Sequence, residues 1–486
     1  MKRIGFFASL FGGIILAGCA GMPHKQAPVS LPKEAPLDGL EYKGGGEWPA
    51  PDWWKQYSDA TLDALITLGA AESPSLATAH ARFESAEQSV RLAAAAAGAH
   101  IDANADMTRQ RLSENGLFPP RLLGFTWYNL ADLGLQGSYT FDWWGKQRLA
   151  VESAMDQAHA AQADRSAALL LLASSISDTY FGWQADQNRL ALARETEQTI
   201  EQEADITSAR VKADLEAADS IEHSNLRLAQ AREQIAALEG SAKLRVVALA
   251  ALVGKPISQL PTLTVHALPS VSGALPDSVK LDLIARRADI TASRWRVEAA
   301  EKTLASARAE FYPDVSINAL LGVQSVDVGK LLQYSSRVPQ IGAAIHLPIF
   351  DEGRLKAQYG AARAAIDSAV STYQDTVVSA TREVGTQITT LAQIESERVQ
   401  RRVQVDAALN IRSAEGARVE QGLTDARTEL SADEAWIAQR DALLQLDAAA
   451  LSADIALQQA LGGGYSPPQS TNTAARGAAS TPATTP

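Results

Sequence analysis

The sequence predicts a mainly helical protein with a smaller membrane β part, built from one supersecondary unit that occurs twice. Three observations lead to this fold class. One stretch of sequence recurs a little over 200 residues downstream of itself. Within each copy the spacing of apolar residues changes from the helical value of about 3.6 to the strand value of 2. Each copy also holds a proline-free stretch far longer than an ordinary globular helix.

The composition of the 486 residues excludes several classes of protein. The formal net charge is −12, whereas nucleic-acid-binding proteins usually carry a basic surface. The single cysteine excludes an internal disulfide and a multi-cysteine metal site. The seven histidines form no metal-binding helix motif, and no phosphate-binding glycine loop occurs, so we expect neither an enzyme nor a cofactor. No run of 18 apolar residues follows the first twenty, so no ordinary membrane-spanning helix is expected.

The N-terminus has the pattern of a secretory signal that ends at the cysteine. Residues 1–18 comprise a basic start, a short apolar run and small residues before Cys19, as in a signal peptide. The alternative is a short buried helix with a core cysteine. Residues 16–19 resemble the bacterial lipobox, which implies that Cys19 carries a covalent lipid. Ala20, in place of aspartate, resembles lipoproteins sent to the outer membrane.

Two segments lack the composition of folded elements. Residues 19–46 are rich in Pro, Lys and Gly, so we expect a lipidated, extended tether. Residues 465–486 consist mostly of Gly, Ser, Thr, Ala and Pro. Such a segment buries too little apolar surface to offset the entropy of ordering, so we expect a disordered tail.

The chain between these ends is internally duplicated. Residues 81–87 match residues 295–301 at an offset of 295 − 81 = 214. Farther along, the offset is 208, as between Gly145 and Gly353. One constant offset over some 110 positions is not a chance match, and a six-residue difference in one loop explains the change. We therefore expect a first repeat over residues 47–265 and a second over residues 266–464.

Each repeat is expected to begin with a helix, at about residues 73–97 and 287–310, followed by two strands. Apolar side chains alternate with polar or small ones, as from Ile101 to Met107. Strands of about nine residues with this alternation suit a membrane β-barrel, although two half-buried hairpins packed on helices fit the local pattern equally well. The expected strand pairs cover residues 100–142 and 314–349.

The connections differ at the two ends of the strands. Long loops are expected at about residues 109–132 and 324–338, whereas strand-to-helix transitions are abrupt at Gly145 and at Pro348 and Gly353. Long outer loops and tight inner connections are typical of outer-membrane barrels. Three tryptophans are candidates for an interfacial belt, with core packing as the alternative for the last two: Trp127, Trp143 and Trp144.

Long helices follow the transitions, at residues 145–212 and 353–421, and shorter helices return at residues 219–253 and 425–461. At 1.5 Å per residue the first long helix spans about 100 Å, a length suited to crossing a periplasm. Abundant alanine at helical spacing lets neighbouring helices approach closely.

Four strands do not close a membrane barrel, because an open sheet edge is not tolerated in lipid. Identical chains must therefore complete it. Two chains would give eight strands with a filled interior, whereas three give twelve strands and, with two long and two return helices each, twelve helices. We expect a homotrimer with a 12-stranded β-barrel continuous with a 12-helix periplasmic α-barrel.

Between about Trp53 and Gly464 the chain resembles an outer-membrane factor of the TolC/OprM class, in its lipoprotein, NodT-type branch. The motifs that carry the resemblance lie at residues 53–59, 138–148, 286–290, 309–313, 347–355 and 460–465. In two places the chain departs from the family pattern. Ala288 stands where the family usually has proline, and Ala99 falls opposite Pro313.

The resemblance implies a passive exit duct in the outer membrane, which conducts small molecules such as drugs or toxic metabolites. It implies as partners a periplasmic adaptor and an inner-membrane pump of the RND type. Two alternatives stay open. One is the outer-membrane duct of a type I protein secretion system, and the other is a periplasmic adaptor or helical scaffold lipoprotein.

The resemblance also implies a periplasmic aperture narrowed by a ring of acidic side chains. The two aspartates common in the family align here with Thr428 and Ser431, so other acidic residues of the two helix turns are the candidates. Solvated helix faces are the alternative for all of them. The candidates are Asp425, Glu429 and Asp433 in the second repeat and Asp214, Glu216 and Asp219 in the first.

Overall fold

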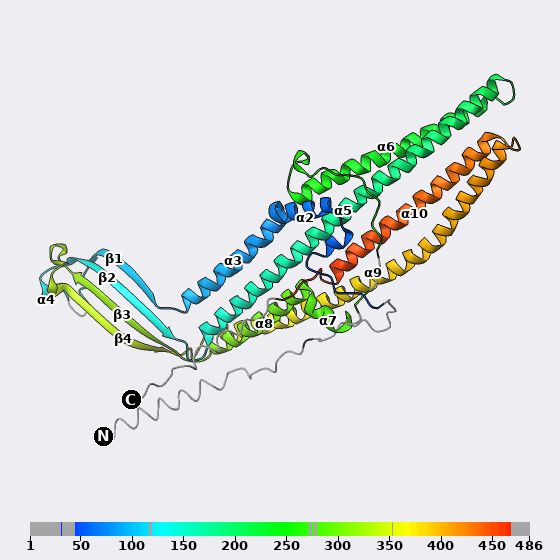
Figure 1. Cartoon of the computed structure of the whole chain (residues 1–486). Coiled ribbons are helices and arrows are strands. Elements are labelled where there is room, and N and C mark those ends of the chain that lie inside the picture. The colour runs from blue at the N-terminus through cyan, green and yellow to red at the C-terminus, as the bar shows by residue number, and fades with distance from the viewer. Residues whose placement is uncertain are drawn as a thin grey trace, which may run out of the picture. The chain divides into compact units, whose positions relative to one another are not determined.

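The computed structural model describes residues 31, 44–115, 119–271, 275–276, 279–351 and 353–467 (Figure 1). The predicted signal peptide, Cys19, most of the predicted tether and residues 468–486 of the predicted tail lie outside the described residues.

Four strands form one antiparallel sheet in the order β1-β2-β3-β4. They are β1 (His100–Arg111), β2 (Trp127–Phe141), β3 (Asp314–Ser325) and β4 (Arg337–His346). The strands have 12, 15, 12 and 10 residues, so the expected length of about nine was too short. The ladder continues through polar and aromatic ends, as where Arg111 pairs with Trp127, because backbone pairing does not require apolar side chains.

The helices account for most of the remaining described chain. The α-helices are α2 (Ala60–Glu72), α3 (Pro74–Ala96), α4 (Pro120–Leu123), α5 (Lys146–Lys212), α6 (Asp219–Val253), α7 (Val279–Arg286), α8 (Ala288–Ala309), α9 (Arg354–Glu420) and α10 (Ala426–Ala460). Short 3-10 helices are η2 (Trp53–Tyr57), η3 (Ile257–Gln259), η4 (Val328–Lys330) and η5 (Tyr334–Ser336). Sequence analysis did not anticipate α2, α4 and α7. Among the described residues no helix combines the length and the apolar composition needed to cross a membrane.

The chain divides into two compact units that do not follow the two repeats. Apart from residue 31, the described residues of one unit lie in residues 83–160 and 293–373 and include the whole sheet. The described residues of the other lie in residues 44–82, 161–292 and 374–467. Each unit therefore takes segments from both repeats.

The helical unit has two apolar clusters built in the same way. In the first, Leu62 and Leu65 of α2 pack with Ile176 of α5 and Leu249 of α6. In the second, most of the buried side chains come from α7, α9 and α10, and they include Leu283, Ile388 and Leu457. The short helix of each repeat thus packs on the long hairpin of that repeat, and the cluster around α2 also contains Leu451 of α10.

The backbone repeats as the sequence does. Helices α5 and α9 each have 67 residues, and α6 and α10 each have 35. Left-handed residues recur at the same distance of 353 − 145 = 422 − 214 = 462 − 254 = 208 residues. These pairs are Gly145 and Gly353, Asp214 and Gly422, and Gly254 and Gly462. This equivalence supports the duplication inferred from the sequence.

Candidate functional site

The register of the sheet places most of the large apolar side chains of the four strands on one face. Ala103 lies opposite Leu135, and Leu135 lies opposite Leu321. The large side chains of this face are exposed, which is unusual for a folded chain unless another surface or lipid covers them. The exposed members are Ile101, Met107, Trp127, Leu133, Leu135, Tyr139, Ile317, Leu321, Ile341 and Ile345.

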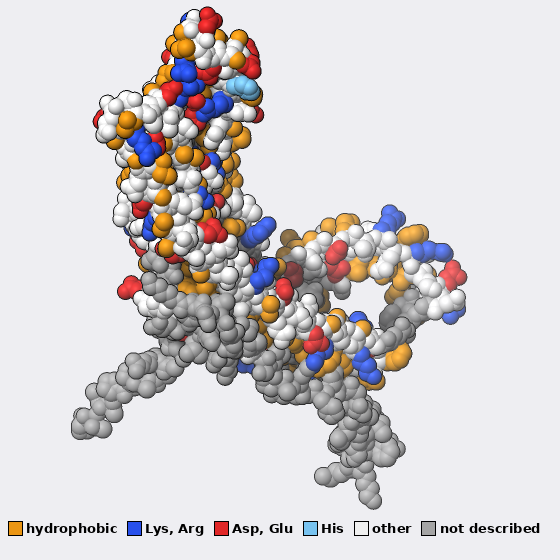
Figure 2. All heavy atoms as spheres, turned by 90° about the vertical axis from the view of Figure 1, so that its right-hand side faces the viewer, with side chains coloured by type: hydrophobic (Ala, Val, Ile, Leu, Met, Phe, Trp, Pro, Cys, Tyr) orange, Lys and Arg blue, Asp and Glu red, His pale blue; other side chains and the backbone are white. Residues whose placement is uncertain are grey.

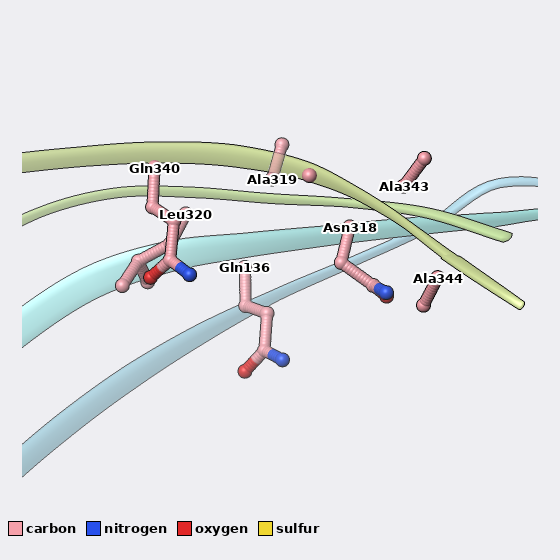
Figure 3. A pocket seen from close by; sticks show the side chains of 8 residues that line it. Gln136, Asn318, Ala319, Leu320, Gln340, Ala343 and Ala344 are labelled. Atoms are coloured by element: carbon pink, nitrogen blue, oxygen red, sulfur yellow. The ribbon is translucent and has the colours of Figure 1, made fainter. Parts of the chain in front are cut away.

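The opposite face is polar and concave. Gln136, Asn318 and Gln340 line a hollow of about 330 Å³ on it. Figure 3 shows the side chains of Gln136 and Asn318 on one side of the sheet and those of Ala319 and Ala343 on the other. A sheet that curves with its polar face inward has the geometry of the wall of a water-filled barrel.

A pair of like charges indicates that this polar face is in contact with water. Asp106 and Asp132 lie directly opposite each other on β1 and β2. Such a pair is unfavourable unless water screens it. Gln324 of β3 donates a hydrogen bond from Nε2 to Asp132 Oδ1 at 2.6 Å. The polar face therefore suits an aqueous channel lining.

The strand-to-helix transitions are tight turns closed by an aspartate. Gly145 and Gly353 adopt left-handed φ angles of 76° and 88°, one residue before α5 and α9 respectively. The Asp142 carboxylate accepts a hydrogen bond from the Arg148 backbone N–H at 2.7 Å, and Asp351 accepts one from Leu355 N–H at 2.9 Å. Each carboxylate thus caps a helix start. Pro348 lies two residues beyond β4.

The three tryptophans near the sheet are all exposed, and Trp144 also donates a hydrogen bond to the backbone. Trp144 donates from Nε1 to the Pro313 carbonyl at 2.9 Å and stacks on Tyr312 at 4.4 Å between ring centroids. These contacts fix the Trp144 ring on the unit, but the side chain remains 45% exposed and does not lie in a core. Trp127 and Trp143 are exposed as well, and Trp143 stacks on Phe141 at 5.7 Å between ring centroids.

The N-terminal motif at residues 53–59 has a structural role in the helical unit. Tyr57 donates a hydrogen bond to Asp454 of α10 at 2.7 Å, and both side chains are buried. Burial raises the pKa of the Asp454 carboxyl, although the Tyr57 hydroxyl opposes this shift. Asp59 caps α2 and also accepts a hydrogen bond from Tyr180 of α5 at 2.7 Å. The motif therefore fixes the start of the chain to the helices.

The helix hairpins α5–α6 and α9–α10 end in matching turns. The residue in the left-handed conformation is Asp214 in one turn, with φ 57°, and Gly422 in the other, with φ 71°. The backbone N–H that follows each of them bonds the carbonyl five residues earlier, at 2.9 Å in both turns.

Four charged side chains, which we call the tip cluster, join the two turns: Arg210, Glu216, Asp425 and Arg427. Arg427 contacts Asp425 at 3.2 Å and Glu216 at 3.0 Å. Arg210 contacts Glu216 at 3.1 Å and Asp425 at 3.3 Å. Figure 2, in which the hairpin tips face the viewer, shows basic and acidic side chains interleaved there. Each carboxylate of the tip cluster is thus shared by two guanidinium groups.

The tip cluster keeps both of its carboxyls ionised. The Arg427 backbone N–H, followed by the Arg427 and Arg210 guanidinium groups, holds the pKa of Asp425 below its usual value. Partial desolvation acts to raise the pKa of Glu216, but Arg210 and Arg427 outweigh it, so that pKa is also lowered.

The remaining aperture candidates do not join the tip cluster. Asp433 pairs with Arg412 at 2.6 Å, and Glu429 is half-buried beside Gly416. Asp214 and Asp219 are exposed at their turn. Among the described residues, no group of three or more His, Cys, Asp or Glu side chains could hold a metal ion.

Sequence reasoning found the acids of the tip cluster but missed its arginines. Arg427 lies two residues from Asp425, and Arg210 lies six residues before Glu216. Oppositely charged residues this close together in two equivalent turns could have indicated ion pairs between the turns.

Comparison with known proteins identifies the family. The family model described as "Outer membrane efflux protein" matches residues 65–255 and 281–463. The chain belongs to this family. It is 32% identical over 477 residues to "Multidrug resistance outer membrane protein MdtP" of Escherichia coli (strain K12), covering 96% of this chain and 97% of that protein.

Solved structures of outer-membrane proteins have the same fold. The outer membrane protein VceC from Vibrio cholerae is 31% identical, with a TM-score of 0.77 over 86% of this chain and 100% of that one. The outer-membrane channel OprN, at 23% identity, has a TM-score of 0.81 over 92% and 99% of the two chains. The outer membrane efflux protein described here is thus an outer-membrane exit duct of an efflux system.

Proposed function

We propose that three copies of this chain close a single duct through the outer membrane. The observation that carries the proposal is the open sheet, whose β1 and β4 edges have no partner strand in the described chain. Unpaired backbone groups on such edges are not tolerated in lipid. Pairing β4 of one copy with β1 of the next removes every edge, and three copies give a 12-stranded barrel wide enough for an aqueous lumen.

The two faces of the sheet support this assembly. The exposed apolar face would contact lipid, and the concave polar face with Gln136 and Asn318 would line the lumen. The hairpins α5–α6 and α9–α10 of three copies would supply the twelve helices of a periplasmic tube. We propose further that the chain divides into repeats at residues 47–265 and 266–464, each of which supplies one strand pair and one helix hairpin.

The hairpin tips are the proposed periplasmic aperture. The tip cluster would hold the two hairpins of each copy together and keep the aperture narrow. Because Asp425 and Asp433 are paired with arginines, the candidates for an acidic lining are Glu429, Asp214 and Asp219. Three copies of such carboxylates around a narrow opening would attract cations.

The name of a relative supports a proposal for the cargo and the partners. Because MdtP is named a multidrug resistance protein, we propose that this duct conducts small molecules, including drugs. It would receive them from a periplasmic adaptor and an inner-membrane pump of the RND type. The duct itself would have no enzymatic activity and no cofactor beyond the lipid on Cys19.

The oligomeric state of the detergent-solubilised full chain tests the proposed assembly. The mass of the protein part should correspond to three copies of a chain of 51.7 kDa, less the cleaved signal. A dimer or a monomer would contradict the proposed duct.

The lipid anchor is tested by growing cells with labelled palmitate. We expect the wild-type chain to incorporate the label and Cys19→Ser to incorporate none. Equal labelling of the two chains would show that Cys19 is not the lipidated residue.

A further inference from the structure

We propose that Arg109, Arg111 and Arg337 bind the phosphate groups of lipid A, the glycolipid of the outer leaflet. This inference rests on the proposed function, because it requires the sheet to span the outer membrane. The three arginines are exposed and lie on edge strands, two on β1 and one on β4.

The three arginines lie on the apolar, convex face of the sheet. Arg109 and Arg111 continue the alternation of Ile101 and Met107 along β1. Arg337 lies opposite Val323, on the same face as Ile341. A charged side chain on this face is costly at the middle of a membrane but is accommodated at its surface.

The position of the arginines along the strands corresponds to the membrane surface. Arg109 and Arg111 are among the last three residues of β1, and Arg337 is the first residue of β4. All three therefore lie at the loop end of the sheet, whereas the opposite end leads into α5 and α9. With the helices in the periplasm, the loop end faces the outer leaflet.

Aromatic side chains accompany the arginines. The Arg109 guanidinium lies 5.8 Å from the Trp127 ring centroid, and the Arg337 guanidinium lies 4.3 Å from that of Tyr334. Trp127 and Tyr334 are exposed. Tryptophan and tyrosine rings favour the level of lipid headgroups. The guanidinium groups are thus held where lipid phosphates lie, and their planar fork matches a phosphate.

The proposed assembly makes the site composite. Because β1 and β4 are the two edges, pairing them between copies brings Arg337 of one copy beside Arg109 and Arg111 of the next. Three such sites would surround the barrel. Lipid A carries two phosphates on a rigid disaccharide above several acyl chains, so it can contact these cations and the apolar face together.

The acid nearest to these arginines does not neutralise the site. Arg111 lies 3.7 Å from Glu114, and both side chains are more than half exposed. Such an exposed pair is weak, so a phosphate can replace it. Lys330 makes a similarly exposed pair with Asp327 at 3.4 Å, but it is not assigned to the site because it lies in η4, beyond the strands.

Binding of lipid A to the detergent-solubilised full chain tests the proposal. The probes are bisphosphorylated lipid A, the same lipid A with both phosphates removed, and phosphatidylethanolamine. We expect the wild type to prefer bisphosphorylated lipid A. The triple variant Arg109→Gln/Arg111→Gln/Arg337→Gln should bind it about tenfold more weakly, as expected from the loss of charged hydrogen bonds.

A matched variant controls for total charge. Arg82→Gln/Arg91→Gln/Arg402→Gln removes three exposed arginines from helices and should bind like the wild type. Replacing the three site arginines by lysine should preserve only part of the affinity, because the charge remains but the planar fork is lost. If the glutamine triple variant does not assemble, Arg337→Gln alone should still weaken binding about threefold.

Equal binding of bisphosphorylated lipid A by the wild type and the glutamine variant would overturn the proposal, as would an equal loss in the helix-arginine control. Conductance in phosphatidylethanolamine bilayers separates this proposal from the proposed function. If the glutamine variant conducts and binds lipid A as the wild type does, the lipid site alone is wrong. If neither the wild type nor Arg427→Gln conducts, the duct itself is wrong.

Discussion

Two glycines at the ends of the return helices lie very close to the backbone of another helix of the same repeat. Gly254 and Gly462 end the return helices with φ angles of 77° and 94°. A Cβ at Gly254 would lie 2.8 Å from the Glu72 carbonyl oxygen, and one at Gly462 would lie 2.1 Å from the Arg286 carbonyl oxygen. In both repeats the end of the last helix thus packs against the backbone just before α3 or α8.

Replacing Gly462 by alanine should therefore destabilise the protein. The left-handed conformation and the close carbonyl together should cost at least about 2 kcal/mol of unfolding free energy. Gly240→Ala is the matched control, because Gly240 lies inside α6 with nothing within 4 Å of the added Cβ. The control should be neutral or stabilising by up to about 1 kcal/mol. Thermal unfolding of the two variants checks this, and equal melting temperatures would contradict it.

A second residue-scale prediction concerns the buried bond between Tyr57 and Asp454. Tyr57→Phe leaves the buried carboxylate without this donor and should cost about 1–3 kcal/mol at neutral pH. Burial raises the pKa of Asp454, so in the folded protein this carboxyl binds a proton at a higher pH than an exposed aspartate does. The loss should therefore shrink as the pH falls toward the ordinary carboxyl range.

Asp454→Asn is the control for Tyr57→Phe. The asparagine carbonyl still accepts the Tyr57 hydrogen bond, and the buried charge is removed. This variant should be at least as stable as the wild type at neutral pH. Melting curves from pH 4 to 8 for both variants decide the matter, and a loss in Tyr57→Phe that grew toward low pH would count against this explanation.

At the scale of elements, the tip cluster links the turns of the two helix hairpins, whose helices are also joined by ion pairs farther from the turns. Arg427→Gln removes the contacts to Glu216 and Asp425 and should loosen the hairpins, with a severalfold rise in single-channel conductance. Arg232→Gln is the matched control. Arg232 pairs with Glu197 and Glu201 of α5, within one hairpin, so its loss should leave conductance unchanged. The same increase in both variants would argue against a specific link.

The tip cluster also predicts how the duct responds to pH. Asp425 and Glu216 have folded pKa values below the ordinary 3.8 and 4.5. Their contribution is therefore complete at neutral pH and is lost only as the pH falls through those lowered values. Conductance should be constant from pH 8 to about 5 and should rise below about pH 4. A rise already between pH 7 and 6 would show that another group controls the aperture.

Elements in which apolar residues recur regularly over many positions were predictable from the sequence. Elements that depend on contacts between residues far apart in the chain were not. Helices α5 and α9 follow from uninterrupted helical spacing, and the shared face of Leu133 and Leu135 follows from alternation. Helix α2 is short, and its burial depends on Ile176 and Leu451, more than a hundred residues away. The tip cluster likewise joins Glu216 to Arg427, which only the folded hairpins bring together.

At the scale of the whole molecule, one chain holds a fraction of the proposed duct. Within the described chain the sheet has two unpaired edges, an exposed apolar face and a concave polar face. In the proposed assembly the edges pair with neighbouring copies, lipid covers the apolar face and the polar face encloses the lumen. The internal duplication gives each chain two strand pairs and two helix hairpins, so three copies provide six of each. The length of the chain therefore results from the repetition of one unit and not from several independent domains.

The claim that copies of this chain form a conducting duct is tested most directly by single-channel recording of the full chain in planar lipid bilayers. We predict discrete, repeated steps of ion conductance from the purified trimer. A homogeneous trimer that inserts into the bilayer and gives no conductance steps, even with Arg427→Gln, would contradict the duct.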